Sequence, residues 1–90
     1  MKTHHYIIQG RVQGVNFRYY TQRTAHQLGV TGTVKNLYNG DVQVYAQGEE
    51  ATIKKFEEFI NRGPSSARVE RVIRKEFEDK NAFPDFDVIF

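Results

Sequence analysis

The order in which strand and helix patterns follow one another is the feature that most constrains how this chain can fold. Alternating apolar side chains are typical of strands, and apolar side chains three and four residues apart are typical of helices. The sequence predicts a strand over residues 6–12, a helix over 17–28, a hairpin of strands over 30–37 and 41–47, a second helix from 48–50 to 62–64, a strand over 67–77 and a short strand over 86–90. This β-α-β-β-α-β order, with one strand added at the end, predicts an α+β, ferredoxin-like fold in which two helices pack on one face of an antiparallel sheet.

Apolar stripes indicate which sides of these elements are buried. The first helix has its stripe at Phe17, Tyr20 or Thr21, Thr24, Ala25 and Leu28, and the second at Ile53, Phe56, Phe59 and Ile60. The strand over 67–77 carries charges of alternating sign, which predicts an exposed edge. Its apolar alternation slips around residues 71–73, which predicts a bulge there.

The hairpin has an Asn-Gly pair at its tip, and its register can be argued from the valines on either side. A two-residue loop would split those valines between the two faces of the sheet. A three-residue loop, with Gly40 as a left-handed bulge, places Val34 opposite Val44 and Asn36 opposite Val42. We prefer this register, which places Asn36 on the covered face at the end of its strand.

The composition is that of an ordinary globular protein, with 39% hydrophobic and 27% charged residues in a chain of 90. A chain of this length is expected to form one domain, over residues 1–90. It contains no cysteine, which excludes disulfides and thiolate chemistry. We see neither the apolar core of a secretory signal nor an apolar run of membrane-spanning length. We therefore expect a cytoplasmic protein with no membrane partner, and nothing in the sequence demands more than a monomer.

A glycine-containing loop joins the first strand to the first helix, and an arginine stands in that helix's first turn. The first N–H groups of a helix have no partner within it, and the helix dipole places partial positive charge there. Gly14 lets the backbone approach a ligand, so the amides of residues 14–18 can form an anion nest. Arg18 adds a planar fork that can hold two phosphate oxygens. The loop predicts a phosphate site; the alternative is an ordinary junction with a solvated arginine, and the net charge of +2 decides little between them.

Two blocks of sequence resemble the signatures of the acylphosphatase family. The first is G-x-V-Q-G-V-x-F-R over residues 10–18, and the second is G-x-V-x-N-x-x-N-G-x-V over residues 32–42, at the family's usual separation. The ending F-x-V-x-F over residues 86–90 also resembles the family's last strand, so the resemblance covers essentially the whole chain. One departure is Asn39, where members commonly have aspartate before the glycine. Both residues suit that turn, so we expect no loss of activity from it.

The resemblance implies an enzyme that hydrolyses the carboxyl–phosphate bond of acyl phosphates by direct attack of water, without metal or cofactor. It implies that Arg18 binds the phosphoryl group and that Asn36 orients the water, with inorganic phosphate or sulfate as a product-like ligand. From the residues alone, Asn36 would instead be a strand-end asparagine bonded to nearby backbone. The implied phosphate-binding loop consists of Gln13, Gly14, Val15, Asn16, Phe17 and Arg18.

Other reactive side chains give no comparable pattern. His4, His5 and His26 lack metal-ligand spacing, and adjacent histidines on a strand face opposite sides, so we expect no metal site. The remaining candidates are expected in loops or facing solvent: His26 on the outer side of its helix, Ser65 and Ser66 with no evident base, and Asp85 and Asp87 beside the last strand.

Two other classes of function compete with catalysis. Ferredoxin-like sheets also serve as RNA-binding modules, in which aromatic side chains on the open face stack on bases. Here Tyr45 is a single candidate for that role, so we expect no nucleic-acid partner. The second class is a non-catalytic phosphate-binding module, such as the acylphosphatase-like domain within carbamoyl-transfer maturation proteins. Hydrolysis by the isolated chain separates that class from an enzyme.

Overall fold

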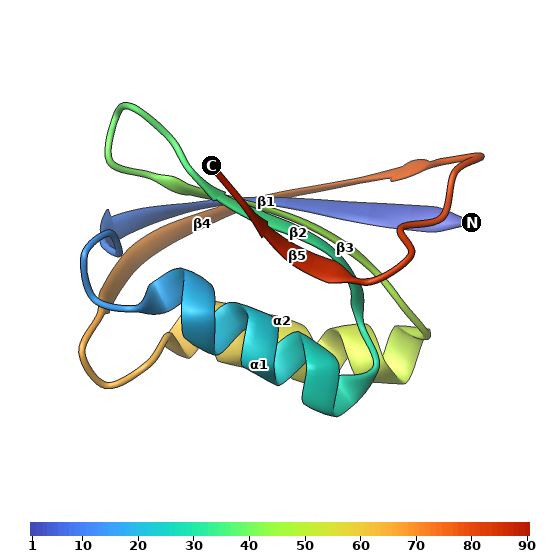
Figure 1. Cartoon of the computed structure of the whole chain (residues 1–90), viewed down its shortest axis with the longest axis horizontal. Helices are drawn as coiled ribbons and strands as arrows, with labels where there is room; N and C mark the ends of the chain where they lie inside the picture. Colours follow the sequence, from blue (N-terminus) through green and yellow to red (C-terminus); the bar gives the residue numbers. More distant parts are fainter.

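The computed structural model describes all residues from 1 to 90 and contains one five-stranded sheet with two helices on one face (Figure 1). The elements are β1 (Lys2–Arg11), α1 (Phe17–Leu28), β2 (Thr31–Asn36), β3 (Val42–Gln47), α2 (Glu50–Arg62), β4 (Arg68–Glu78) and β5 (Phe86–Ile89). The strands are ordered β4-β1-β3-β2-β5. Strands β1 to β4 pair antiparallel, whereas β5 pairs parallel with β2. The ferredoxin-like prediction is confirmed, with the added strand at the edge beside β2. No helix is long and apolar enough to cross a membrane.

The predicted hairpin register is confirmed. Val34 lies opposite Val44, and Asn36 lies opposite Val42. The loop closes through a 2.8 Å hydrogen bond from the Leu37 N–H to the Asp41 carbonyl, which leaves three residues at the tip. Gly40 has a φ of 96°, the left-handed conformation that the bulge requires. Asn36 therefore shares the face of Val34, which is fully buried beneath the helices.

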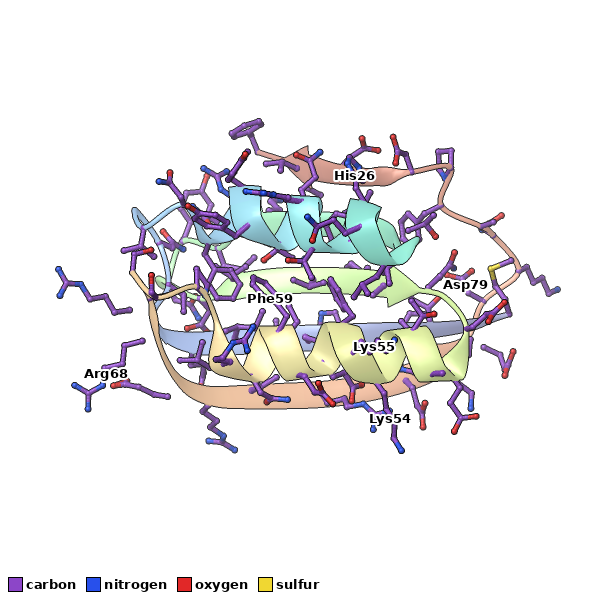
Figure 2. The ribbon with its side chains drawn as sticks, turned by 90° about the horizontal axis from the view of Figure 1, so that it is seen from below. His26, Lys54, Lys55, Phe59, Arg68 and Asp79 are labelled. Carbon is purple, nitrogen blue, oxygen red and sulfur yellow. The ribbon has the colours of Figure 1, made fainter.

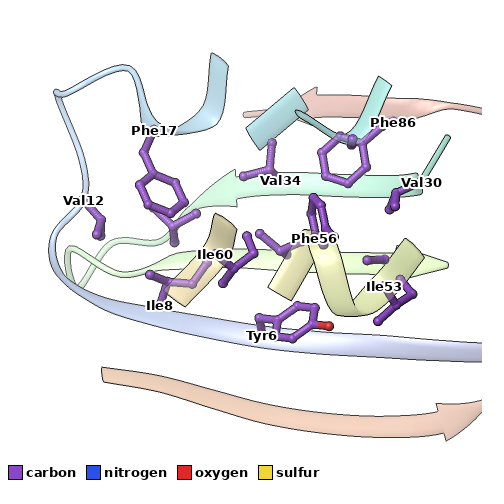
Figure 3. Close-up of a cluster of buried hydrophobic side chains, with 14 residues drawn as sticks. Tyr6, Ile8, Val12, Phe17, Val30, Val34, Ile53, Phe56, Ile60 and Phe86 are labelled. Atoms are coloured by element: carbon purple, nitrogen blue, oxygen red, sulfur yellow. The ribbon is translucent and has the colours of Figure 1, made fainter. Parts of the chain in front are cut away.

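The core lies between the sheet and the two helices (Figure 3). Its centre is Phe56 of α2, whose ring lies 6.3 Å from that of Tyr6 and 5.8 Å from that of Phe86, measured between centroids. Phe59 lies between the helices in Figure 2 and contacts Phe17, with 6.3 Å between ring centroids. The apolar stripe of α2 is as predicted. The fully buried members of the α1 stripe are Phe17, Thr21 and Ala25, so Thr21 and not Tyr20 faces the core.

Two details of the predicted strands are wrong. Strand β1 begins at Lys2, whereas the sequence predicted a start at residue 6. The start was not predicted because it contains polar side chains that are buried: the Thr3 hydroxyl accepts a 2.8 Å hydrogen bond from Gln47. The predicted bulge in β4 is present, but it lies at Glu70, one residue before the predicted stretch 71–73. The register with β1 shifts between Gln9 and Gly10, which leaves Glu70 unpaired. The break in the apolar alternation shows only that one extra residue lies in this part of the strand. The pairing with β1 determines that the extra residue is Glu70.

Candidate active site

The loop between β1 and α1 has a left-handed backbone at two positions and leaves its backbone N–H groups unpaired. Gly14 has a φ of 74°, and Asn16 is left-handed as well, with φ 62° and ψ 24°. Asn16 occupies the N-cap position of α1 but makes no side-chain cap hydrogen bond. The first helical hydrogen bond is donated by the Tyr20 N–H to the Asn16 carbonyl at 3.1 Å, and the N–H groups of residues 14–18 have no acceptor within the chain. A left-handed residue followed by a helical one turns successive N–H groups to the same side, which forms a nest for an anion.

Gln13 holds this loop against the hairpin that carries Asn36. Its Nε2 donates to the Leu37 carbonyl at 2.7 Å and to the Asp41 carbonyl at 2.8 Å. The two carbonyls come from either side of the hairpin tip, so a single amide group spans the tip and ties it to the loop. Gln13 was predicted as a member of the phosphate-binding loop, but the hydrogen bonds of its side chain to the hairpin were not predicted.

Ser66 fixes the loop from the other side. Its hydroxyl donates a 2.8 Å hydrogen bond to the Val15 carbonyl. The same Val15 packs against the hydrophobic core. Ser66 lies in the connection between α2 and β4, and no pattern in the sequence connected it with the loop 51 residues earlier. Two side-chain contacts and one apolar contact therefore fix the loop, whose own N–H groups remain free.

Arg18 lies in the first turn of α1, and its guanidinium stacks on an aromatic ring. The guanidinium carbon lies 4.8 Å from the ring centroid of Phe90, a cation–π contact. The parallel register explains why Phe90 is at this place: Val88 pairs with Val34, so two residues further along both strands Phe90 comes level with Asn36. No carboxylate forms an ion pair with Arg18, which leaves its N–H groups available to an anion.

Asn36 brings a buried and unpartnered amide oxygen to the same place. Its Oδ1 is shielded from solvent and accepts no hydrogen bond within the chain. A buried carbonyl oxygen without a donor is costly, since nearly all such groups in folded proteins are paired. Asn36 is one of the residues that line a cavity, so a molecule held there with an O–H or N–H group is a candidate donor for this oxygen. The bonding of Asn36 to nearby backbone, the other expectation for this residue, is not what the structure shows for its oxygen.

The loop, α1, β2 and β5 border an open cavity of about 390 Å³. It is lined by Val12, Gly14, Asn16, Phe17, Arg18, Tyr19, Gln22, Asn36, Val88 and Phe90. Four of the six predicted loop residues therefore meet Asn36 here. Val15 instead packs on the core, and Gln13 lines a neighbouring cavity of about 450 Å³. Five lining residues were not predicted from the sequence: Val12, Tyr19, Gln22, Val88 and Phe90. The positions one and four residues after Arg18 on a helix could have suggested Tyr19 and Gln22.

The cavity holds no carboxylate and no histidine, and its titratable side chains are Arg18 and Tyr19. His26 lies outside it, exposed on the outer side of α1 as predicted, next to β5 (Figure 2). Its Nε2 lies 3.2 Å from the Phe86 carbonyl and 3.3 Å from Asp85 Oδ1. Asp85 and Asp87 are exposed, also as predicted. The site therefore offers the free N–H groups of residues 14–18, which form an anion-binding cradle, together with the guanidinium of Arg18 and the amide of Asn36. It has no group suited to general base catalysis.

Titratable side chains gather at a second place, under α2 and away from the cavity. The Tyr6 hydroxyl donates to Glu57 Oε2 at 2.6 Å, and Arg74 Nε donates to the same oxygen at 2.7 Å. Burial, with the neighbouring Glu57, raises the pKa of Tyr6 well above its usual range. Glu57 raises the pKa of Arg74, and burial together with Arg74 lowers the pKa of His4. A hydroxyl, a carboxylate and a guanidinium that satisfy one another fit a structural role for this group.

Comparison with known proteins shows a similarity to acylphosphatases along nearly the whole chain. The acylphosphatase family model matches residues 4–88. An acylphosphatase of Geobacter sulfurreducens is 48% identical over 81 residues, which are 90% of this chain and 89% of that protein. The crystal structure of an acylphosphatase from Bacillus subtilis superposes with a TM-score of 0.95 at 31% identity and covers 100% of both chains. The structure of full-length HypF in its phosphate- and nucleotide-bound form contains a similar unit, with a TM-score of 0.86 at 28% identity over 12% of that chain.

Proposed function

The chain belongs to the acylphosphatase family and is an enzyme that hydrolyses acyl phosphates, and we propose that the cavity between the β1–α1 loop and the end of β2 is its active site. One observation carries the proposal: residues with free backbone N–H groups, an arginine without an ion pair and an asparagine with an unpartnered amide oxygen all line the same cavity. The first two bind the phosphoryl group, and the third positions the water that attacks it.

Binding of the phosphoryl group is assigned to the N–H groups of residues 14–18 and to Arg18. The oxygens of the phosphoryl group carry the negative charge of the substrate and share the charge of the transition state. Donors that are already in place when the substrate arrives stabilise that charge without reorganising, and donors of this kind are often the largest contribution to catalysis. Phe90 holds one side of the guanidinium, so the fork of Arg18 is oriented before phosphate binds.

Orientation of the attacking water is assigned to Asn36. Its buried Oδ1 accepts a hydrogen bond from the water, which leaves an oxygen lone pair free to point at phosphorus. The water oxygen then forms a bond to phosphorus as the bond from phosphorus to the carboxyl oxygen breaks, and the carboxylate leaves with the electron pair. A carboxylate is a weak base, so its departure needs little help from an acid. An amide is a poor base, and we infer that the water gives its proton to a phosphoryl oxygen or to solvent.

Hydrolysis of benzoyl phosphate in the presence of EDTA tests this assignment. We expect rapid turnover by the parent protein. We expect Asn36→Ala to lower kcat by at least a hundredfold while inorganic phosphate still binds, because the cradle is untouched. Arg18→Ala should lose both turnover and phosphate binding, and Arg18→Lys should stay impaired because a point charge cannot replace the planar fork. Lys55→Ala, an exposed position on α2 (Figure 2), removes a charge far from the cavity and serves as the control.

Each outcome bears on a different part of the proposal. Equal loss of phosphate binding in Asn36→Ala would show that this residue holds the phosphoryl group and not the water. Strong inhibition by EDTA would show that a metal takes part. A well-folded parent without turnover would favour the non-catalytic phosphate-binding module, and a salt-sensitive complex with RNA would favour the nucleic-acid module.

We also propose that residues 1–90 act as one acylphosphatase-like domain, as a cytoplasmic monomer without a nucleic-acid or membrane partner. The exposed edge strand β4 supports the monomer, because charged side chains along an edge discourage pairing with another chain. Sedimentation velocity tests the oligomeric state, and cell fractionation tests the location. Inorganic phosphate or sulfate should bind as a product-like ligand, which a shift of the melting temperature with phosphate concentration would measure.

A further inference from the structure

Two arginines stand opposite each other at the end of the sheet that carries the cradle. Arg11 is the last residue of β1 and Arg68 is the first of β4, and the two are paired in the antiparallel register. Like charges directly opposite each other on neighbouring strands destabilise a sheet. An arginine on the edge strand β4 has a structural reason, because charge on an edge discourages pairing with another chain. Strand β1 lies inside the sheet, so Arg11 has no such reason.

No carboxylate neutralises this pair. Arg11 and Arg68 are exposed, and neither takes part in an ion pair. The same is true of Arg62 at the end of α2 and of Arg71 on β4. By contrast, Arg74 farther along β4 is paired with two carboxylates. Figure 2 shows Arg68 pointing away from the body of the molecule, so its charge is free to act on solutes.

Basic and acidic side chains are distributed unevenly along the molecule. The β1–α1 loop, the hairpin tip and the α2–β4 connection lie at one end (Figure 1). Residues 11–18, 35–42 and 62–71 meet there and hold six basic side chains and two acidic ones. Residues 46–51 and 75–86 lie at the opposite end and hold six acidic side chains and two basic ones. The cradle therefore lies at the positive end of the molecule.

The free arginines are near enough to the cavity for their charge to act there. Arg11 directly precedes Val12, which lines the cavity. Arg62 directly precedes Gly63, and a methyl group at Gly63 would lie 3.3 Å from the ring of Phe17, another lining residue. Charges in water act over about 10 Å at an ionic strength of about 0.1 M. The molecule extends 32 Å along its longest axis, so the carboxylates of the opposite end do not cancel the positive charge at the cavity.

We propose that Arg11 and Arg68, supported by Arg62 and Arg71, steer the phosphoryl group of the substrate electrostatically to the cradle without touching it. The inference rests on the proposed function, since the arginines serve the cavity to which that function is assigned. A phosphoryl group carries about two negative charges at pH 7, so each free arginine raises its concentration at the cavity. These arginines act before the substrate is bound and should therefore affect its capture and not the chemical step. The opposed pair is retained although it weakens the sheet.

The test is the double variant Arg11→Gln/Arg68→Gln, assayed on benzoyl phosphate over a range of ionic strength. At about 0.01 M, where charges act over about 30 Å, we expect kcat/KM to fall about fivefold with kcat unchanged. At about 1 M, where they act over about 3 Å, the variant should match the parent. The matched control is Lys55→Gln/Lys80→Gln, which removes the same charge from exposed lysines without ion pairs. It should change kcat/KM much less.

Two further measurements separate steering from a structural role. Removal of the opposed charges should raise the midpoint of urea unfolding, whereas the loss of a structural contact would lower it. The affinity for inorganic phosphate, measured by calorimetry at about 0.01 M ionic strength, should fall by a factor similar to that in kcat/KM, because the same charges attract both anions. This titration requires no turnover.

An equal fall in both double variants would overturn the inference, because net charge and not its placement would then matter. A loss that persists at high ionic strength, a lower kcat or a lower unfolding midpoint in Arg11→Gln/Arg68→Gln would overturn it as well. Failure of the proposed function looks different: Arg18→Ala and Asn36→Ala would retain turnover. The phosphate titration would still report whether the opposed pair acts on the cavity, so the two errors are distinguishable.

Discussion

Replacement of Gln13 by alanine tests whether the loop and the hairpin form one unit. The substitution removes two hydrogen bonds, of 2.7 Å to the Leu37 carbonyl and 2.8 Å to the Asp41 carbonyl. Neither carbonyl is left without a donor, because Leu37 also accepts from the Gly40 N–H and Asp41 from the Leu37 N–H. The penalty for an unsatisfied buried carbonyl therefore does not apply. At about 1 kcal/mol for each ordinary hydrogen bond, the expected loss of unfolding free energy is about 1 to 2 kcal/mol.

Urea unfolding and kinetics on benzoyl phosphate measure the two consequences of Gln13→Ala. With an m value of about 1 kcal/mol per molar urea for a small domain, the midpoint should fall by about 1 to 2 M. The kcat should fall more than tenfold, because the cradle and Asn36 lie on the two segments that Gln13 joins, and small displacements of catalytic groups cost large factors in rate. Gln27→Ala, at an exposed position of α1 without a side-chain hydrogen bond, is the matched control and should change neither quantity appreciably.

A Gln13→Ala protein with the midpoint and kcat of the parent would refute this reasoning. It would mean that the backbone of the loop holds its own conformation without the hairpin. A fall in the midpoint with an unchanged kcat would show that Gln13 stabilises the fold but does not align the cradle with Asn36. The predicted result is that both fall together.

Three further predictions concern the cradle, the guanidinium and the second cluster of titratable groups. Gly14→Ala should destabilise the protein by about 1 to 2 kcal/mol, since its φ of 74° is left-handed, although open space surrounds the added methyl; urea unfolding measures this. Phe90→Leu should lower turnover of acetyl phosphate and benzoyl phosphate alike, by several-fold, because Arg18 loses its aromatic partner. The pKa of His4 is lowered in the folded state, so the unfolded state binds more protons as the pH falls below about 6.5. The free energy of unfolding that neutral His4 helps to maintain above that pH is therefore lost on acidification. Unfolding midpoints at pH 7, 6 and 5 should therefore fall more steeply in the parent than in His4→Phe.

Much of the fold could be predicted because most elements follow the apolar period of a strand or a helix along most of their length. The register of the hairpin followed from matching valines across it, since a shift by one residue would have exposed half of them. The start of β1 was missed because Thr3 and His4 are polar and buried, and their partners are distant: Thr3 accepts from Gln47, and His4 lies near Glu76. A buried polar side chain looks like an exposed one in a sequence, and only its partner distinguishes the two.

In the candidate site, contacts between residues that are close in the sequence could be predicted, whereas contacts between distant residues could not. Gly14, Asn16 and Arg18 come together through the local geometry of a loop and one helical turn, which a sequence can indicate. The register of one hairpin then turned Asn36 to the same face. Phe90 reaches the cavity only because β5 runs parallel to β2 and pairs Val88 with Val34. The loop, Arg18 and Asn36 are thus placed by local structure, whereas the aromatic partner of Arg18 depends on how the last strand joins the sheet. Substitutions that loosen the pairing of β5 with β2 should therefore lower turnover through Arg18, while the loop stays fixed by Gln13 and Ser66.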